Sequence, residues 1–248
     1  MKFSGSGILL DIEGTTSPIR FVYDQMFPFV RRELQSYLQT HWANAALSEA
    51  CDLIAQDAGH ASLQAWSEQV LSGDACDSSQ QIALVAGEVA RLMDADVKAT
   101  GLKRLQGLIW KDGFESGELK AELFPDVASC VRAWQQQGLD VRIYSSGSVQ
   151  AQKLFFQHTI EGNLLSCFQA HYDTTTGGKK EAASYAAIAG DYQLSPDKIL
   201  FVSDIVEELD AAKMSGMATV LSVRPGNHPV TNSHQHPAIH SFAEIECV

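Results

Sequence analysis

Two carboxylic acids separated by a single residue, Asp11 and Glu13, follow the short apolar run at residues 7–10. This order predicts a buried strand that ends in acidic side chains. If the chain stays extended, successive side chains alternate, so Asp11 and Glu13 share a face. In open α/β sheets, ligands bind beyond the carboxyl ends of the strands. Two carboxylates held there can divide the roles of nucleophile and proton donor or bind a hard cation, although acidic residues at strand ends are also common turn formers.

A second polar cluster follows the alternating apolar and polar residues at 141–144. Ser145 and Ser146 come directly after this predicted strand, and a helical pattern begins at Val149. Hydroxyls and free backbone N–H groups at the start of a helix form an anion site. A serine that only caps the helix would give the same pattern. The segment taken alone therefore leaves both interpretations open.

Two later segments add positive charge and further carboxylates. Lys179 and Lys180 open a helical run, where a cation opposes the helix dipole unless an anion lies nearby. Either lysine could instead be a solvated surface charge. The apolar run at 199–202 leads to Asp204, and Glu208 follows in a predicted helix. Asp204 could cap that helix, bind a metal ion, or do both.

In this order, the four segments resemble the motifs of the haloacid-dehalogenase superfamily of phosphohydrolases: Asp-x-Asp-x-Thr, Ser or Thr, Lys, and a paired acidic motif, each at a strand end. Glu13 stands where the superfamily has its second Asp. With this glutamate, the Tyr-Ser-Ser-Gly-Ser run at 144–148 and the Arg-Pro-Gly-Asn run at 224–227, the chain is similar to enolase-phosphatases. The similarity continues through residues 37–42 and 105–110.

The resemblance implies a role for each motif residue. Asp11 would be the nucleophile that forms an aspartyl-phosphate, and Glu13 would be the general acid that protonates the leaving group and then activates water. Lys179 is preferred to Lys180 because it aligns better with the family's Gly-x-Lys. The implied binding residues are Ser145, Ser146 and Lys179 for phosphate; Asp11, Asp204 and the backbone carbonyl of Glu13 for one Mg²⁺ per chain; and Glu208 in support of a metal-bound water.

The resemblance also implies the reaction. Enolase-phosphatases act on 2,3-diketo-5-methylthiopentyl-1-phosphate in methionine salvage. They enolise the diketone and then hydrolyse the ester to acireductone and inorganic phosphate. The expected partner is therefore a small phosphorylated diketone, and the expected cofactor is Mg²⁺. The enolisation base stays open: Glu13 is one candidate, and metal polarisation of a carbonyl would assist.

Other functions are compatible with parts of the pattern. A general sugar-phosphate phosphatase would keep the same core and use a different insert. A haloacid dehalogenase would keep Asp11 but needs neither Mg²⁺ nor an acid at position 13, so Glu13 and Asp204 count against it. A non-catalytic binding protein should have lost at least one catalytic residue, and none of the motif residues is missing.

Composition narrows the class of protein further. With 248 residues, 45% apolar and 19% charged, the chain is expected to fold into an ordered globular protein. A net charge of −12 argues against general binding to nucleic acids or anionic membranes. Five scattered cysteines without C-x-x-C spacing favour reduced thiols in the cytoplasm. No run approaches the roughly 20 apolar residues of a membrane span, and we expect a monomer.

The order of predicted elements indicates an α/β fold with a doubly wound, mainly parallel five-stranded sheet. Residues 1–18 and 117–248 are expected to form this Rossmann-like hydrolase core. Residues 19–116 show only helical periodicity and are expected to form an inserted helical cap. The segment 228–248 is polar and is expected to be irregular, with solvent-exposed histidines and no catalytic role.

Overall fold

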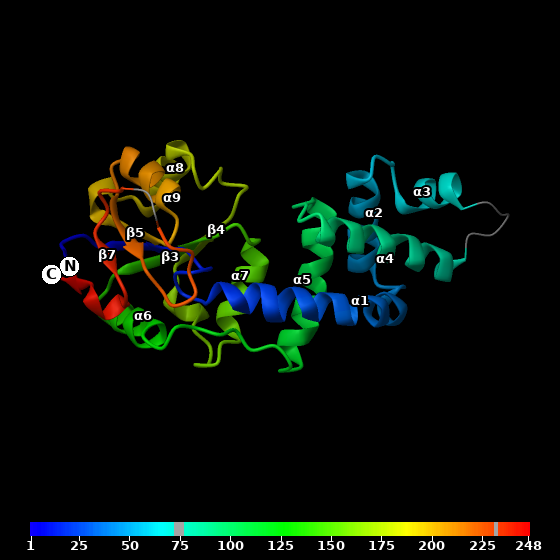
Figure 1. Ribbon diagram of the computed structural model, residues 1–248, viewed down its shortest axis with the longest axis horizontal. Helices are drawn as coiled ribbons and strands as arrows, with labels where there is room; N and C mark the ends of the chain where they lie inside the picture. Colours follow the sequence, from blue (N-terminus) through cyan, green and yellow to red (C-terminus); the bar gives the residue numbers. More distant parts are fainter. Residues whose placement is uncertain (72–76, 231–232) are drawn as a thin grey trace. The chain divides into compact units, whose positions relative to one another are not determined.

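The computed structural model describes residues 1–71, 77–230 and 233–248, and its chain divides into two compact units. Unit 1 comprises residues 1–24 and 119–248, and unit 2 comprises residues 25–118 (Figure 1). Unit 2 is thus a single insertion into unit 1. The sequence predicted such an insertion at 19–116, and the functional roles of core and cap remain predictions.

The described part of unit 1 is built on a six-stranded parallel sheet of order β4-β3-β2-β5-β6-β7. All four residues of β2 and all five of β5 are buried, as expected for central strands covered on both faces. The predicted fold class is confirmed, with one more strand than expected, β7. The strands are β2 (Gly7–Leu10), β3 (Asp140–Tyr144), β4 (Ala170–Tyr172), β5 (Ile199–Ser203), β6 (Ala218–Ser222) and β7 (Ala238–Ile239).

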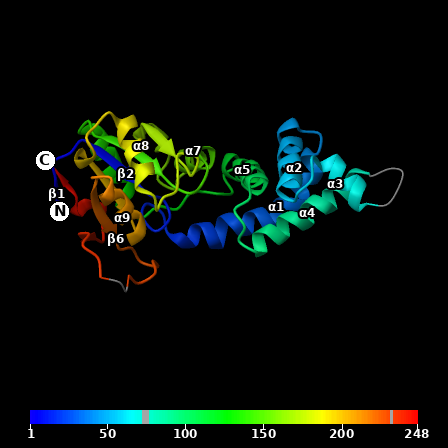
Figure 2. The same cartoon turned by 90° about the horizontal axis from the view of Figure 1, so that it is seen from above.

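Helices cover both faces of this sheet. Helices α8 (Ala182–Tyr192) and α9 (Val206–Met214) pack on one face, against a buried cluster that includes Leu9 and Phe201. Helix α6 (Val127–Gln136) lies on the opposite side of the sheet (Figure 1), and Figure 2 shows the same structure from above. Helix α7 (Val149–Gln157) contacts β4, and the short 3₁₀ turns η2 (Leu165–Cys167) and η3 (Pro196–Lys198) complete the connections.

The described residues of unit 2 form helices joined by short turns and loops, without a strand. The predicted apolar stripes are buried, including Val30, Leu34 and Leu38 of α1 and Val85 and Val89 of α4. Pro28 lies in the first turn of α1, as predicted. The helices are α1 (Phe27–His41), α2 (Ala45–Asp57), α3 (Leu63–Val70), α4 (Ser78–Asp94) and α5 (Thr100–Glu115), preceded by a π-helical segment, η1 (Phe21–Met26).

One glycine explains how closely α2 and α5 pack. A Cβ atom on Gly101, in the first turn of α5, would lie 2.3 Å from the backbone nitrogen of Ile54 in α2. No real Cβ atom tolerates such a contact with backbone, so only glycine allows this approach.

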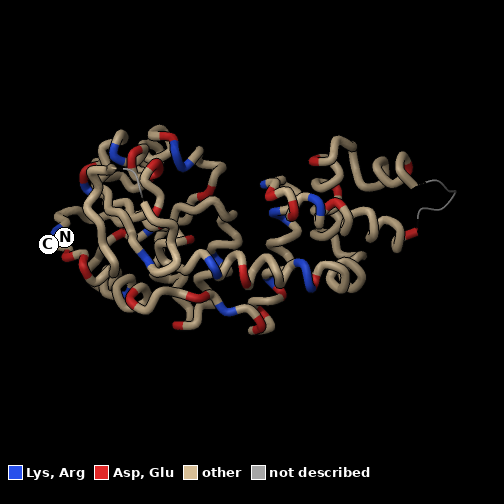
Figure 3. The backbone as a smooth tube through the Cα atoms, viewed as in Figure 1, with Lys and Arg blue, Asp and Glu red and all other residues tan. Residues whose placement is uncertain are grey.

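Acidic and basic residues are interspersed along the traces of both units (Figure 3).

The predicted irregular tail at 228–248 is more ordered than expected. It contains β7, the turn η4 (Phe242–Glu244) and β8 (Glu246–Cys247), which pairs in parallel with β1 (Lys2–Phe3). The prediction of exposed histidines is wrong for His236, which is 6% exposed. Its ring nitrogens lie 2.8 Å from Thr219 Oγ1 and 3.0 Å from Asp210 Oδ1. The pattern missed this because the segment folds back onto β6.

Two further expectations concern the cysteines and the membrane. The four described cysteines are free thiols, and the fifth, Cys76, lies outside the described residues. Within the described ranges, no helix is both long and apolar enough to cross a membrane.

Candidate active site

The sheet register brings the predicted polar residues to one edge. Leu10, the last residue of β2, lies opposite Ile143 of β3 and Val202 of β5. Asp11 follows β2 directly, and its backbone N–H donates to the carbonyl of Val202 at 3.0 Å. Because the strands are parallel and in register, the residues after β3 and β5, Ser145 and Asp204, lie at the same edge as Asp11.

Lys179 joins two carboxylates at this edge. Its Nζ lies 2.6 Å from Asp11 Oδ1 and 2.8 Å from Glu208 Oε2, and its side chain is 10% exposed. Burial acts to lower the pKa of Lys179, but the charges of Asp11 and Glu208 outweigh it and hold the pKa above its usual value. The ammonium group is therefore charged. Lys180, the alternative in the sequence, is exposed.

Glu208 and Asp204 carry strongly perturbed carboxyl groups. Burial, and then the charge of Asp11, raises the pKa of Glu208 to about 7, although Lys179 and Ser203 act in the opposite direction. The Ser203 hydroxyl donates to Glu208 Oε2 at 2.9 Å. Burial followed by the charges of Asp11 and Glu208 raises the pKa of Asp204 to about 8. Among the described residues, the cluster thus has more carboxyl groups than the Lys179 cation can balance when all of them are ionised.

Glu13 lies beside this cluster. Its Oε2 accepts a hydrogen bond from the Ser145 hydroxyl at 3.3 Å. Burial raises the pKa of Glu13, and the charge of Asp11 adds to this, while Lys179 opposes it. A carboxyl group with a raised pKa can hold a proton near neutral pH and deliver it to a leaving group.

The turn after Glu13 approaches Asp204 closely. Gly14 has a φ of +74°, a conformation that favours glycine. A Cβ atom at this position would lie 2.2 Å from Asp204 Oδ2. The glycine of the first motif is therefore required both by its backbone conformation and by the carboxylate beside it. Asp204 does not cap α9, because the N-cap position belongs to Ile205.

The donor set fits a hard divalent cation. Asp11 and Asp204 offer carboxylate oxygens, and the backbone carbonyl of Glu13 receives no hydrogen bond from the described part of the chain. Oxygen ligands of this kind are those that Mg²⁺ prefers, together with several waters. Among the described residues, no three His, Cys, Asp or Glu side chains form a complete metal cage. The predicted set of two carboxylates and one carbonyl supplies three ligands, so water and phosphate would supply the others of the six that Mg²⁺ prefers.

The three serines after β3 differ in their hydrogen bonds. The Ser145 hydroxyl also accepts from the backbone N–H of Gly147 at 3.2 Å, and Ser148 caps α7 by accepting from the backbone N–H of Ala151 at 3.3 Å. Ser146 is half-buried and has no side-chain hydrogen bond to the other predicted site residues in the described chain. The capping interpretation thus applies to Ser148, while Ser145 faces Glu13.

Three buried hydroxyls that the sequence did not indicate hold the loop carrying Lys179. Tyr144 donates to the carbonyl of Gly177 at 2.8 Å, Ser184 to that of Gly178 at 2.9 Å, and Tyr185 to that of Lys179 at 2.6 Å. Lys179 lies before α8 rather than on it, so these bonds replace helical ones. Nothing in the local pattern distinguishes these hydroxyls from ordinary core residues.

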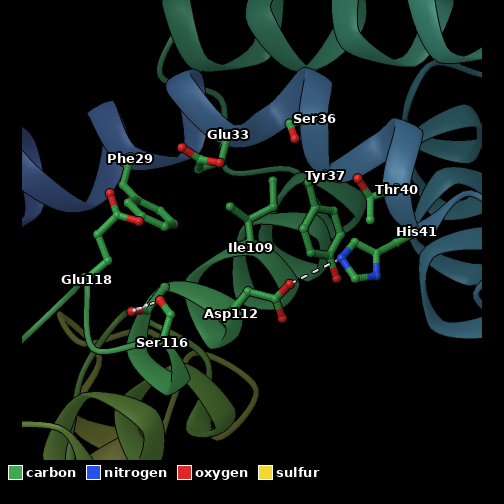
Figure 4. Close-up of a pocket in the computed structure, with 11 residues that line it drawn as sticks. Phe29, Glu33, Ser36, Tyr37, Thr40, His41, Ile109, Asp112, Ser116 and Glu118 are labelled. Atoms are coloured by element: carbon green, nitrogen blue, oxygen red, sulfur yellow. Dashed lines mark hydrogen bonds and ion pairs between the residues drawn. The ribbon is translucent and has the colours of Figure 1, made fainter.

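A separate pocket of about 280 Å³ lies within unit 2, between α1 and α5 (Figure 4). Tyr37, His41 and Asp112 line one end of it. His41 Nε2 lies 3.3 Å from Asp112 Oδ2, and the Tyr37 and His41 rings stack with centroids 4.4 Å apart. Burial and the charge of Asp112 raise the pKa of Tyr37 to about 12, so its hydroxyl stays protonated.

The parallel sheet and the acidic, hydroxyl and lysine side chains at its edge define a class of hydrolase. The family model of haloacid dehalogenase-like hydrolases matches residues 6–216. Solved structures agree on the fold: the putative HAD-hydrolase YfnB from Bacillus subtilis, described as bound to magnesium, is 13% identical with a TM-score of 0.55 and covers 98% of this chain and 97% of its own. At that identity, the likeness concerns the fold alone.

Closer relatives narrow the family. Enolase-phosphatase E1 from Synechococcus sp. (strain CC9605) is 41% identical, covering 97% of this chain and 96% of the relative. Enolase-phosphatase E1 from Synechococcus elongatus is 44% identical, covering 96% of both chains. The UTR4 protein of Saccharomyces cerevisiae is 33% identical with a TM-score of 0.76, covering 96% of this chain and 99% of its own. The chain belongs to the enolase-phosphatase family, as the motifs predicted.

Proposed function

We propose that this chain enolises 2,3-diketo-5-methylthiopentyl-1-phosphate and then hydrolyses the phosphate ester, giving acireductone and inorganic phosphate in methionine salvage. The observation that carries the proposal is the buried contact of Lys179 with Asp11 and Glu208, beside Glu13 at the end of β2. Adding the diketone phosphate and following acireductone by ultraviolet absorbance, with phosphate release in parallel, tests both half-reactions.

Asp11 is proposed as the nucleophile. An Asp11 carboxylate oxygen forms a bond to phosphorus as the bond between phosphorus and the ester oxygen breaks, which gives an aspartyl-phosphate. The Lys179 ammonium, 2.6 Å from Asp11 Oδ1, offsets the negative charge of the phosphoryl group as it is transferred. Hydrolysis of the aspartyl-phosphate then regenerates Asp11.

Glu13 is proposed as the general acid and base. Its raised pKa favours the protonated state in which it can donate to the leaving oxygen. After that donation it is a carboxylate, which can take a proton from the water that attacks the aspartyl-phosphate. The Ser145 hydroxyl, 3.3 Å from Glu13 Oε2, lies where it can contact both this carboxyl and a phosphate oxygen.

The remaining assignments concern phosphate and metal. We assign Ser145, Ser146 and Lys179 to the phosphate oxygens. We assign one Mg²⁺ to Asp11, Asp204 and the carbonyl of Glu13, with Glu208 in support. Bound Mg²⁺ would stabilise the negative charge of the transferring phosphoryl group. Hydrolases of this family generally depend on Mg²⁺, and the crowded carboxylates of Asp204 and Glu208 support a cation there.

The wider assignments follow from the same reasoning. The substrate class of a phosphatase is a small phosphorylated molecule, and we propose that unit 2 selects the diketone tail. We further propose that the protein works as a monomer in the cytoplasm, where its described cysteines would stay reduced.

Metal dependence is the first testable consequence. Phosphate release should fall about tenfold or more in EDTA and return when Mg²⁺ is added, because the transferring phosphoryl group would lose its counter-charge. Asp204→Ala should raise the Mg²⁺ concentration needed for half-maximal activity by about tenfold, since it removes one of two carboxylate ligands. Titrating Mg²⁺ against phosphate release measures both. Asp210→Ala, on the exposed side of α9, should leave the titration unchanged. Full activity in chelator would favour dehalogenase-like chemistry instead.

The two half-reactions should separate in Glu13→Gln. Glutamine keeps the shape but carries no transferable proton, so the variant should enolise the diketone while phosphate release stalls. Enol-phosphate should therefore accumulate, because Glu13 must enter the hydrolysis step protonated and another group acts as the enolising base. Stopped-flow absorbance of the conjugated enol, recorded beside a phosphate assay, measures this. If no enol signal forms, Glu13 is itself the enolising base.

A further inference from the structure

The Arg-Pro-Gly-Asn run at 224–227 contains a buried arginine behind the turn that carries Glu13. The Arg224 side chain is 3% exposed. Its two terminal nitrogens donate to Asp126 Oδ1 and Oδ2 at 2.8 and 2.9 Å, a bidentate pair. Its guanidinium carbon lies 4.8 Å from the Phe124 ring centroid and 4.7 Å from that of Phe242. Arg224 is therefore held rigidly on several sides.

Three consecutive carbonyl groups of the turn are held by this region. Arg224 Nε donates to the carbonyl of Thr15 at 3.3 Å. Asn227 Nδ2 donates to the carbonyl of Gly14 at 2.9 Å, and the backbone N–H of Phe124 donates to that of Thr16 at 3.1 Å. Asn227 and Phe124 are themselves tied to Arg224, the first by a backbone bond of 3.2 Å and the second by its ring.

The position of the Glu13 side chain depends on this turn more than that of Asp11 does. Asp11 is fixed by its backbone bond to Val202 and by Lys179. Glu13 directly precedes Gly14, and its carboxyl group has Ser145, at 3.3 Å, as its one side-chain hydrogen-bond partner in the described chain. The direction of the Glu13 side chain is thus set mainly by the backbone of the turn. That backbone is held by its own hydrogen bonds to the carbonyl of Ile12 and, from outside, by Arg224 at Thr15.

We propose that Arg224 is a positioning residue for proton transfer. It holds the carbonyl of Thr15 and supports Asn227 and Phe124, which hold those of Gly14 and Thr16, so that the Glu13 carboxyl faces the leaving oxygen. The inference rests on the proposed role of Glu13 as the general acid. Displacement of the turn would then impair substrates whose leaving group needs a proton, while attack by Asp11 would continue. A purely structural role would impair every substrate alike.

Two aryl phosphates separate these roles. Phenoxide is a basic leaving group that needs a proton, whereas p-nitrophenoxide leaves readily without one. Arg224→Lys keeps the charge but loses the bidentate geometry and the Thr15 contact. We expect its kcat/KM to fall at least tenfold for phenyl phosphate and less than threefold for p-nitrophenyl phosphate. In a Glu13→Gln background, adding Arg224→Lys should lower kcat/KM for phenyl phosphate less than threefold, because the carboxyl group that Arg224 positions is already lost.

A matched control is Arg142→Lys. Arg142 is also largely buried, lies 2.7 Å from Asp140 and has its guanidinium carbon 4.0 Å from the Tyr192 ring centroid, but it does not contact the turn. Arg142→Lys should change kcat/KM for the two aryl phosphates by the same factor. Thermal unfolding of each variant measures how much the substitution destabilises the fold. If Arg224→Lys folds poorly, Asn227→Ala, which removes only the Gly14 contact, should show the same leaving-group dependence.

Equal losses on both aryl phosphates in Arg224→Lys and Asn227→Ala would overturn the positioning role. The role would also be overturned if Arg224→Lys lowered kcat/KM for phenyl phosphate as much in the Glu13→Gln background as in the wild-type protein. The diketone phosphate is assayed alongside on the wild-type protein. If the wild-type protein hydrolyses the aryl phosphates but not the diketone phosphate, the proposed substrate fails, while the aryl comparison still decides the role of Arg224.

Discussion

Replacing Asp11 with asparagine should reduce phosphate release at least about a thousandfold, because the amide cannot form the aspartyl-phosphate. The fold should persist. Asparagine is nearly isosteric, and the charge of Asp11 is one of the causes that raise the pKa of Glu13, Asp204 and Glu208. Removing that charge relieves repulsion in the cluster, so the variant should unfold at the same temperature as the wild type or above it.

A phosphate assay and a thermal unfolding curve, recorded on the same preparation, check this result. Asp197→Asn, at an exposed position in η3, serves as the control and should retain full activity. Mass spectrometry should exclude deamidation of the introduced asparagine back to aspartate. Phosphate release above about a hundredth of the wild-type rate, with deamidation excluded, would rule out Asp11 as the nucleophile.

Lys179→Met should cost at least about a hundredfold in phosphate release, because it removes the one cation between two carboxylates and a phosphate-binding group. Methionine is of similar length, so the site should stay filled. Asp11 and Glu208 would then have no ammonium between them. Comparison of kcat and KM measures the loss.

Lys180→Met is the matched control for this substitution. Its side chain is exposed on the neighbouring residue, so activity should stay within about twofold of the wild type. Equal effects of the two substitutions, or a larger effect at Lys180, would contradict the assignment of Lys179. Wild-type activity in both variants would remove the lysine from the mechanism altogether.

The strand pattern predicted most of unit 1. The apolar runs near 7–10, 139–144, 168–171, 199–203 and 218–223 became β2 to β6 because alternating or continuous apolar residues report burial directly. The sequence pattern did not predict the short strands β7 and β8. A strand of two residues carries no periodicity, and the pairing of β8 with β1 joins residues more than 240 positions apart.

The site was predictable where the chemistry depends on residue type at a strand end. Parallel strands bring their carboxyl ends to one edge, so Asp11, Ser145 and Asp204 could be expected together before their contacts were known. The buried hydroxyls of Tyr144 and Tyr185 could not be foreseen. Each holds a carbonyl of the lysine loop, and in its local sequence each resembles an ordinary core residue.

By itself, the sequence determined the α/β class, the helical insertion and the acidic, hydroxyl and basic groups available for phosphoryl transfer, because these follow from periodicity and side-chain chemistry. Tertiary structure decided which groups are buried together. It selected Lys179 over Lys180 for contact with Asp11, raised the pKa of Asp204 to about 8, buried His236, and placed Arg224 behind the turn of Glu13. Burial and charge proximity depend on residues far apart in sequence, and only the folded chain brings those residues within a few ångströms of one another.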